Sequence, residues 1–173
     1  MVAISKYDKK CKSTIGGVKK FYLFPFVKHK RSQIITQGME LITFPSTGIT
    51  EFDVIGSYSQ NSEFEGGDLF FNQSCNFNLS EVYNALDIQT LLIANYGIIF
   101  LTNNNEYLLG GVRNGLTGTT TNTSGTEKAE FNGFTLDFTG KEETPLLLIK
   151  DLQDVGFYIN EGGFNYLLNF EMN

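Results

Sequence analysis

Few residues of this chain have side chains that could do catalytic chemistry. The 173 residues include one histidine, His29, and two cysteines, Cys11 and Cys75. A zinc site needs several Cys or His ligands, and acyl transfer by Ser or Cys most often needs a partner histidine. His29 lies in the run Lys-His-Lys-Arg, which favours a solvated turn, and no serine stands in a G-x-S-x-G motif. The sequence therefore predicts a protein that is not an enzyme and has no metal or cofactor site.

Two further patterns are more typical of turns than of catalytic sites. Gly110–Gly115 is glycine-rich like a phosphate loop, but Leu-Thr follows it where that loop has Lys-Ser or Lys-Thr. Glu142 and Glu143 stand between a lysine and a nearby proline, which favours a solvent-exposed turn. Cys75 falls in an expected strand and is interpreted as a small buried residue. A disulfide between Cys75 and Cys11 is left open.

Charge is distributed unevenly along the chain. Residues 1–32 contain nine Lys or Arg and one acid, whereas residues 33–173 contain four Lys or Arg and eighteen acids. A basic arm can bind nucleic acid or an anionic membrane, or it can contact the acidic body of a second copy. We favour the second interpretation, because the acidic body would repel DNA. The predicted self-assembly interface includes Lys9, Lys10, Lys12, Lys28, Lys30 and Arg31.

Length and composition favour a single β-rich domain over residues 1–173. Sixteen Phe, eight Tyr and eighteen Gly suit aromatic strands joined by turns. Residues 1–17 are expected to be a basic N-terminal arm, and residues 155–173 a C-terminal extension. The N-terminus has no apolar signal-peptide core and no apolar run has the length of a membrane span, so we expect no membrane partner.

Apolar alternation and turn signals predict strands along most of the chain. Val18–Val27 is expected to be a strand, in which Pro25 indicates a sheet edge or a bulge. Residues 28–32 are expected to form a basic turn and residues 59–67 a polar loop. The other predicted strands are Gln33–Thr36, Met39–Phe44, Ile49–Tyr58, Asp68–Phe77, Ile98–Thr102, Glu106–Gly110 and Leu146–Ile149.

One segment has a helical pattern. Leu79–Asn95 includes Ser80, a natural N-cap, and Glu81 in the first turn. The apolar stripe allows one helix or two shorter ones.

Residues 112–125 are rich in Gly and Thr, and they are expected to form a long loop or a flexible extended hairpin.

The Asn132-Gly133 pair predicts a two-residue hairpin turn, because both central residues of such a turn need positive φ. That turn would gather apolar residues on one face and an opposite-charge pair on the other. The predicted pairs are Phe131 with Phe134, Ala129 with Leu136, and Lys128 with Asp137.

The C-terminal extension alternates aromatic and polar residues. Phe164, Tyr166 and Leu168 would share one face of an extended chain. An apolar terminal segment of this kind is expected to dock on its own sheet or on a neighbour's. These three residues therefore complete the predicted self-assembly interface.

Three segments resemble the tail-tube-like proteins of phages and prophages of Bacteroidetes-type bacteria. Cys11–Leu23 resembles the opening of that group. The predicted helix Leu79–Asn95, with the strand–turn–strand that ends at Gly110, follows in the same order, and Ser124–Glu142 resembles the group's late hairpin. The resemblance covers roughly residues 11–145, and the segment from Val155 has no counterpart in it.

The resemblance implies a mainly β fold with one helix: a β-sandwich or half-barrel with a flanking α-helix and long extended loops. It implies that six copies close a ring whose inner wall is a continuous β-barrel. Such rings stack into the tail tube around a tape-measure protein, and DNA passes through the lumen during ejection. The implied partners are further copies of the chain and the tape-measure, terminator or baseplate proteins. The implied location is the virion tail, assembled in the host cytoplasm. The family has no catalytic residues or cofactors to carry over.

Two alternatives stay open from the sequence. A neck, tail-terminator or tail-completion ring shares the same fold, so the sequence barely separates it from a tube. A carbohydrate-binding or adhesive β-sandwich would suit the aromatic and Asn side chains, although the chain has no Trp, the strongest sugar-stacking residue.

The charge split makes a first prediction. Deletion of residues 1–12 removes four of the nine basic residues of the segment 1–32 and should weaken self-assembly. Each exposed ion pair contributes about 0–1 kcal/mol, but the contact would repeat around a ring. Sedimentation of the intact and truncated chains over a range of salt concentrations measures the effect. Equal assembly of both chains at every salt concentration would show that the arm takes no part.

Overall fold

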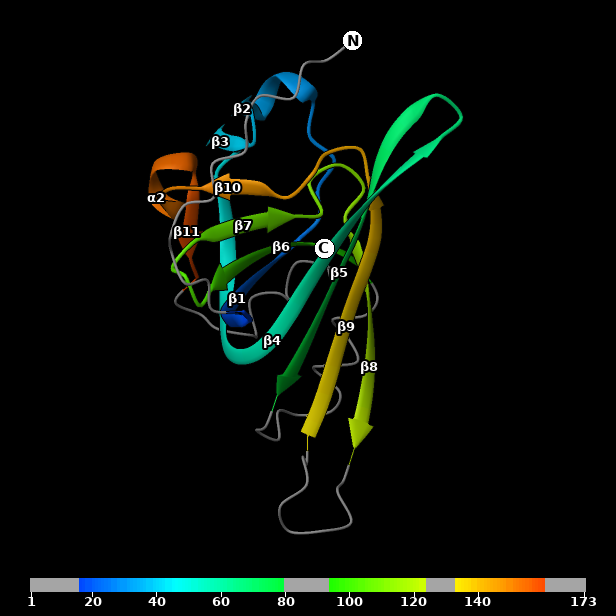
Figure 1. Cartoon of the computed structure of the whole chain (residues 1–173). Coiled ribbons are helices and arrows are strands. Elements are labelled where there is room, and N and C mark those ends of the chain that lie inside the picture. Colours follow the sequence, from blue (N-terminus) through cyan, green and yellow to red (C-terminus); the bar gives the residue numbers. More distant parts are fainter. Residues whose placement is uncertain (1–15, 80–93, 124–132, 161–173) are drawn as a thin grey trace.

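The computed structural model describes residues 16–79, 94–123 and 133–160, and strands dominate it (Figure 1). The mainly β fold class is confirmed. The strands are β1 (Val18–Pro25), β2 (Ile35–Gln37), β3 (Glu40–Thr43), β4 (Thr47–Glu65), β5 (Asp68–Leu79), β6 (Asn95–Thr102), β7 (Tyr107–Gly110), β8 (Leu116–Thr123), β9 (Gly133–Glu142), β10 (Leu147–Ile149) and β11 (Phe157–Ile159). The helical elements are η1 (Arg31–Gln33), a single 3₁₀ turn, and α2 (Leu152–Val155).

Six of the strands close into a barrel. The pairings run from β1 to β4, β5, β9, β8 and β6, and β6 pairs again with β1. All six pairings are antiparallel. The closure between β8 and β6 is short, because only Asn95 and Tyr96 face β8. The strands β7, β10, β3 and β2 continue the sheet from β6 as a flanking layer.

Aromatic side chains fill the barrel. The Phe21 ring stacks on Phe77 at 4.0 Å and on Phe52 at 4.6 Å between ring centroids. Phe21, Phe77 and Phe138 are fully buried. The backbone of Gly56 lies so close to Phe77 that a Cβ there would stand 2.4 Å from the ring. Burial of each of these rings stabilises the fold by roughly 1.5–3 kcal/mol.

A second core lies between the barrel and the flanking layer. Alternate residues of β1 point in opposite directions, so that Phe21 and Leu23 enter the barrel core while Tyr22 and Phe24 enter the second core. β6 is divided in the same way. The flanking layer contributes Leu41, Leu109, Leu147 and Ile149 to the second core. The core is completed by Phe44, by Ile49 of β4, by Val155 of α2 and by Phe157 of β11.

β4 and β5 form a long hairpin that extends beyond the barrel (Figure 1). The ladder runs without interruption from Ile55 opposite Asn78 to Glu65 opposite Asp68. Gly66 and Gly67 make the turn with φ of 63° and 99°, a left-handed conformation that glycine adopts without strain. The predicted loop over residues 59–67 is therefore wrong for residues 59–65. The outer half of this strand is exposed on both faces, so its sequence lacks apolar alternation.

The hairpin predicted around Asn132-Gly133 is also wrong in its pairing. Phe134 lies opposite Asn122 of β8 on one side and opposite Leu79 of β5 on the other. Leu136 lies opposite Thr120 and Phe77. Both edges of β9 are thus occupied by β5 and β8 at Phe134, Leu136 and Asp137. The partners predicted for them, Phe131, Ala129 and Lys128, lie outside the described residues. Of the two alternatives for residues 112–125, extended structure is right over residues 116–123.

Two smaller expectations are corrected as well. β1 is an interior strand, paired with β4 and β6, so Pro25 does not mark a sheet edge. Pro25 is tolerated because it is the last residue of β1, beyond the ladder with β4, which ends at Leu23. The ends of the predicted helix are in strands, Leu79 in β5 and Asn95 in β6, and its residues 80–93 lie outside the described residues.

The aromatic barrel core yields a stability prediction. Phe77→Ala should lower the free energy of unfolding by about 3–5 kcal/mol, because it removes a ring packed against Phe21 and leaves a cavity. Ile55→Ala, on the neighbouring strand but 82% exposed, should change it by less than about 0.5 kcal/mol. Urea denaturation at low protein concentration compares the two. A similar loss for both variants would show that the barrel core does not dominate stability.

Candidate self-assembly surface

The projecting sheet of β4, β5, β9 and β8 has one face turned away from the barrel core, and this outer face is polar. Cross-strand hydrogen bonds join its side chains: the Ser59 and Ser74 hydroxyls at 2.8 Å, and the Thr135 hydroxyl to the Asn78 side chain at 3.0 Å. Ile55 and Phe70 are its apolar members. The remaining members are Ser57, Ser59, Asn61, Glu63, Glu65, Asp68, Asn72, Ser74, Asn76, Asn78, Thr117, Thr119, Thr121, Thr135, Asp137, Thr139 and Lys141.

The same sheet has two unpaired edges within the described residues. β4 pairs with β1 only as far as Gly56, so residues 57–65 have no strand on the edge opposite β5. β8 pairs with β6 only through Leu116 and Thr117, so residues 118–123 have no strand opposite β9. Natural proteins usually protect free edges with charges or proline. Residues 57–62 and 118–123 contain neither.

The tip of the β4–β5 hairpin is both apolar and acidic. Phe64 and Leu69 lie opposite each other and are 74% and 51% exposed. Three acids flank them: Glu63, Glu65 and Asp68. Glu63 and Glu65 share Lys141, whose Nζ also stands 4.6 Å from the centre of the Phe70 ring. The hydrogen bond from Lys141 lowers the pKa of Glu65 below its usual value.

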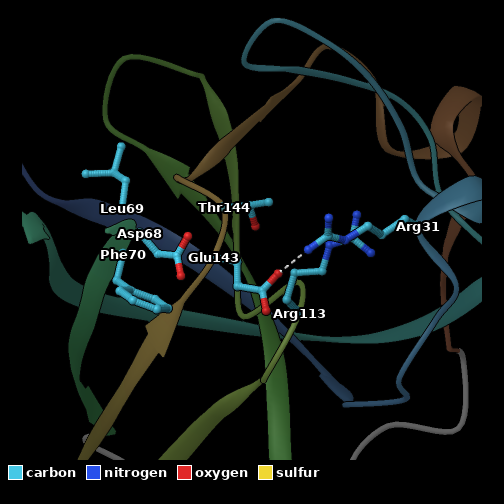
Figure 2. Close-up of a pocket in the computed structure, with 7 residues that line it drawn as sticks. All are labelled: Arg31, Asp68, Leu69, Phe70, Arg113, Glu143 and Thr144. Atoms are coloured by element: carbon cyan, nitrogen blue, oxygen red, sulfur yellow. Dashed lines mark hydrogen bonds and ion pairs between the residues drawn. The ribbon is translucent and has the colours of Figure 1, made fainter. Parts of the chain in front are cut away.

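The predicted basic residues Lys28, Lys30 and Arg31 lie in the exposed connection between β1 and β2. Arg31 forms an ion pair of 2.7 Å with Glu143. Figure 2 shows this pair in an open hollow of about 450 Å³ that Arg113 and Thr144 also line. Asp68, Leu69 and Phe70 of the hairpin line the opposite side of that hollow. The other predicted interface residues, Lys9, Lys10, Lys12, Phe164, Tyr166 and Leu168, lie outside the described residues.

His29 is not the fully solvated turn residue that the sequence predicts. The ring is partly buried and packs edge-on against Phe44, with 5.3 Å between ring centroids. Burial lowers the pKa of His29, and the nearby Arg113 charge lowers it further. The histidine therefore contributes packing at the border of the second core.

Glu142 also differs from its predicted role in a solvated turn. Its side chain is fully buried at the end of β9 and accepts three backbone N–H groups. Oε2 accepts from Arg113 at 2.8 Å, and Oε1 accepts from Asn114 and Gly115 at 2.9 Å each. Burial raises the pKa of this carboxyl, and the three N–H donors offset that rise in part. The carboxylate holds the turn between β7 and β8 against the end of β9.

Gln73 extends this buried polar cluster. Its Oε1 accepts from Gly111 N at 3.0 Å, and its Nε2 donates to Thr144 O at 3.0 Å. Gln60 takes part as well, because its Oε1 accepts from Leu146 N at 2.6 Å. Side chains of the projecting hairpin thus bind the β7–β8 connection and the β9–β10 connection. The hairpin is held at a fixed position on the barrel.

His29 and Cys75 are the only His and Cys side chains among the described residues. The described part of the chain contains no group of three or more His, Cys, Asp or Glu side chains placed to hold a metal ion. Cys75 is a free thiol buried in the barrel core, as predicted, and burial raises its pKa, which disfavours the reactive thiolate. The residues of Gly110–Gly115 form a turn with Gly111 and Gly115 at positive φ.

Comparisons with known proteins return no family model, no curated protein and no solved structure that matches this chain. Within the described part of the chain, no helix is long and apolar enough to cross a membrane.

Sequence reasoning missed the hairpin tip and the two free edges. A signal for the tip was present: Glu-Phe-Glu-Gly-Gly-Asp-Leu-Phe places a glycine pair between two apolar–acidic segments. The edges had no signal, because Ser, Thr and Asn side chains on both sides of a strand resemble a loop. Glu142 had none either, since its donors lie some thirty positions earlier in the chain.

The Glu142 site makes a prediction at neutral pH. Glu142→Gln replaces one carboxylate oxygen by an NH₂ group and leaves at least one buried N–H without an acceptor. The free energy of unfolding should fall by about 1–3 kcal/mol. Glu143→Gln removes only an exposed ion pair, so it should lower the free energy of unfolding by at most about 1 kcal/mol.

The sign of the pH dependence follows from the raised pKa. Between the usual glutamate value and the raised value, the folded chain binds more protons than the unfolded chain, so stability falls as pH rises through that range. The advantage of the native chain over Glu142→Gln should therefore shrink as pH rises. Urea denaturation at several pH values measures it, and an advantage that grows with pH would contradict this account.

Proposed function

We propose that this chain is a non-enzymatic structural subunit that assembles into stacked, hexameric rings and forms the tail tube of a bacteriophage. The proposal joins the resemblance of residues 11–145 to tail-tube-like proteins with the observed sheet. The observation that carries it is a pair of edges on one four-stranded sheet that have no partner strand among the described residues and no charge or proline along residues 57–62 and 118–123. The β4 edge of one copy pairs with the β8 edge of the next, so that each copy gains a strand on both sides.

Edge pairing of this kind is a heterologous contact, and it either closes into a ring or continues as a filament. In a ring of six copies the four-stranded sheets form a single barrel wall. With strands about 4.8 Å apart and tilted by roughly 40°, such a wall is roughly 50 Å across between opposite backbones. That width leaves room for double-stranded DNA after the side chains are added.

The polar outer face of the sheet suits the inner wall of this tube. It consists mostly of Ser, Thr and Asn side chains, with four acids against the single Lys141. Several of these polar groups bond to one another across the strands, including Asn72 with Glu63 and Asn76 with Asp137. A wall of like charge to DNA, with its polar groups already bonded, lets the polymer pass without adhering.

A neck or tail-terminator ring would use the same edges, and the copy number per particle separates it from a tube. A tube contains many stacked rings, whereas an adaptor forms one.

Disulfide cross-linking tests the edge pairing. In a Cys11→Ser background, Asn61→Cys on β4 and Thr119→Cys on β8 place thiols on the outer face of the two free edges, while Cys75 stays buried. Oxidation should give covalent oligomers up to a closed ring, because side chains on neighbouring strands lie about 5 Å apart. Ser59 and Thr121 serve as alternative positions if the register is shifted by two residues.

Each single-cysteine variant is the matched control and should stay monomeric on a non-reducing gel. Negative-stain microscopy of the untreated chain should show rings or tubes. A chain that is strictly monomeric at all concentrations, with no cross-linked ladder at any position, would rule out the proposal.

A further inference from the structure

The tip of the β4–β5 hairpin has an apolar surface that the described part of the chain does not cover. Phe64 and Leu69 lie on the same side of the hairpin as the core residues Cys75 and Phe77, but further out along it. At 74% and 51% exposure, they present a paired apolar contact at the end of a projecting element. The acids Glu63 and Glu65 alternate with these residues, and so lie on the other face of the hairpin, where they pair with Lys141. Asp68, beside the turn, lines the same hollow as Leu69.

A second exposed apolar surface lies on the hairpin of β2 and β3. Ile35, Met39 and Ile42 are 52%, 58% and 38% exposed, although Leu41 between them is buried in the second core. The segment that leads into this hairpin includes Val27, which is 55% exposed, and the basic residues Lys28, Lys30 and Arg31. This surface, the basic–apolar surface of residues 27–42, is thus apolar with a positive border.

We propose that the hairpin tip of one copy docks on the basic–apolar surface of residues 27–42 on a neighbouring copy. Apolar side chains meet apolar side chains, and Asp68, which forms no ion pair within the described residues, meets Lys28 and Lys30. The two surfaces are therefore complementary in both respects. This inference rests on the proposed ring assembly and names the contact that accompanies its edge pairing. The occupant is a second copy of this chain.

The two surfaces of one copy do not satisfy each other. They lie on opposite sides of the hollow in Figure 2, where Arg31 pairs with Glu143 and Asp68 faces it from the hairpin. No ion pair joins the tip to residues 27–42 within the described residues. Both surfaces lie toward the same end of the molecule, with β2 and β3 at the upper left of Figure 1 and the hairpin tip at the upper right. Copies in a ring are related by rotation about the ring axis, and this rotation does not change the position of a residue along the axis. The tip of one copy can therefore meet the surface of residues 27–42 on its neighbour, which lies at the same level.

Variants of exposed residues test the contact without disturbing either core. Phe64→Ser/Leu69→Ser should raise the concentration needed for assembly by about tenfold or more, because two apolar side chains lose their cover. Asp68→Lys and Lys28→Glu/Lys30→Glu should each raise it several-fold. Combined, the two sets of charge changes should restore assembly toward that of the native chain. Asp154→Lys, at an exposed acid on α2, is the control and should leave assembly unchanged. Sedimentation velocity over a dilution series gives these concentrations.

The outcomes separate this contact from the edge pairing. Suppose that the tip variant assembles more weakly but that the Asn61→Cys/Thr119→Cys pair still gives the ladder of cross-linked oligomers at high concentration. That result supports both the docking contact and the edge pairing. Native assembly of the tip and charge variants overturns the docking contact and leaves the edge pairing standing. A lower free energy of unfolding for the dilute, monomeric tip variant also overturns it, because the tip would then be covered by its own chain. Loss of the ladder in the otherwise native chain overturns the ring and the contact that rests on it.

Discussion

The strand β1 and its neighbour β6 are the structural constraint on which the rest of the molecule depends. β1 is bonded to a strand on each edge and buried on both faces, and β6 is apolar along nearly its whole length. A strand in that position belongs to two cores at once. The barrel packs on one side of the β1–β6 pair, through Phe21 and Ile98, and the flanking layer packs on the other, through Tyr22 and Ile99. The barrel and the layer therefore cannot separate without exposing one face of the same two strands.

That shared wall leaves the far side of the barrel free to extend. β5 and β9 contribute their apolar side chains to the barrel core over part of their length and then continue past it with β4 and β8. Such an extension would be loosely placed without further support. The buried cluster of Glu142, Gln73 and Gln60 supplies that support, because its side chains bond the backbone of the two connections beside the hairpin base. Buried polar groups are tolerated when their partners are satisfied, and here the bonds set the direction of the projecting hairpin.

The sequence predicts the parts of this fold where one face of a strand is apolar, and it fails where that condition does not hold. The alternation of Phe21, Leu23 and their neighbours, and the Asn-rich turn between β6 and β7, placed those strands correctly. Residues 59–65 have no buried face, so a strand there has the composition of a loop. The Asn132-Gly133 signal is local, whereas the partners of β9 are decided by which strands reach its two edges. The Phe77 neighbour of Leu136 comes from β5, far earlier in the chain, and the Thr120 neighbour from β8, which a two-residue turn at Asn132-Gly133 would not have paired with it. The burial of Glu142 likewise depends on a turn that no short-range pattern connects to it.

Sheet edges without a partner strand and an exposed apolar tip, as the described residues have them, favour uncontrolled association in a monomeric protein. Their arrangement here favours one specific contact over non-specific association. The two edges belong to one sheet, lie at its opposite sides and are uncharged along residues 57–62 and 118–123, which suits the edge pairing that we propose between copies. The charged residues stand at the end of the β4 edge, where Glu63 and Glu65 are held by Lys141. Charge at that end limits strand addition to residues 57–62, because charged side chains on a sheet edge disfavour pairing with another strand. An edge that is neutral along its length and charged at one end therefore favours ordered pairing over aggregation.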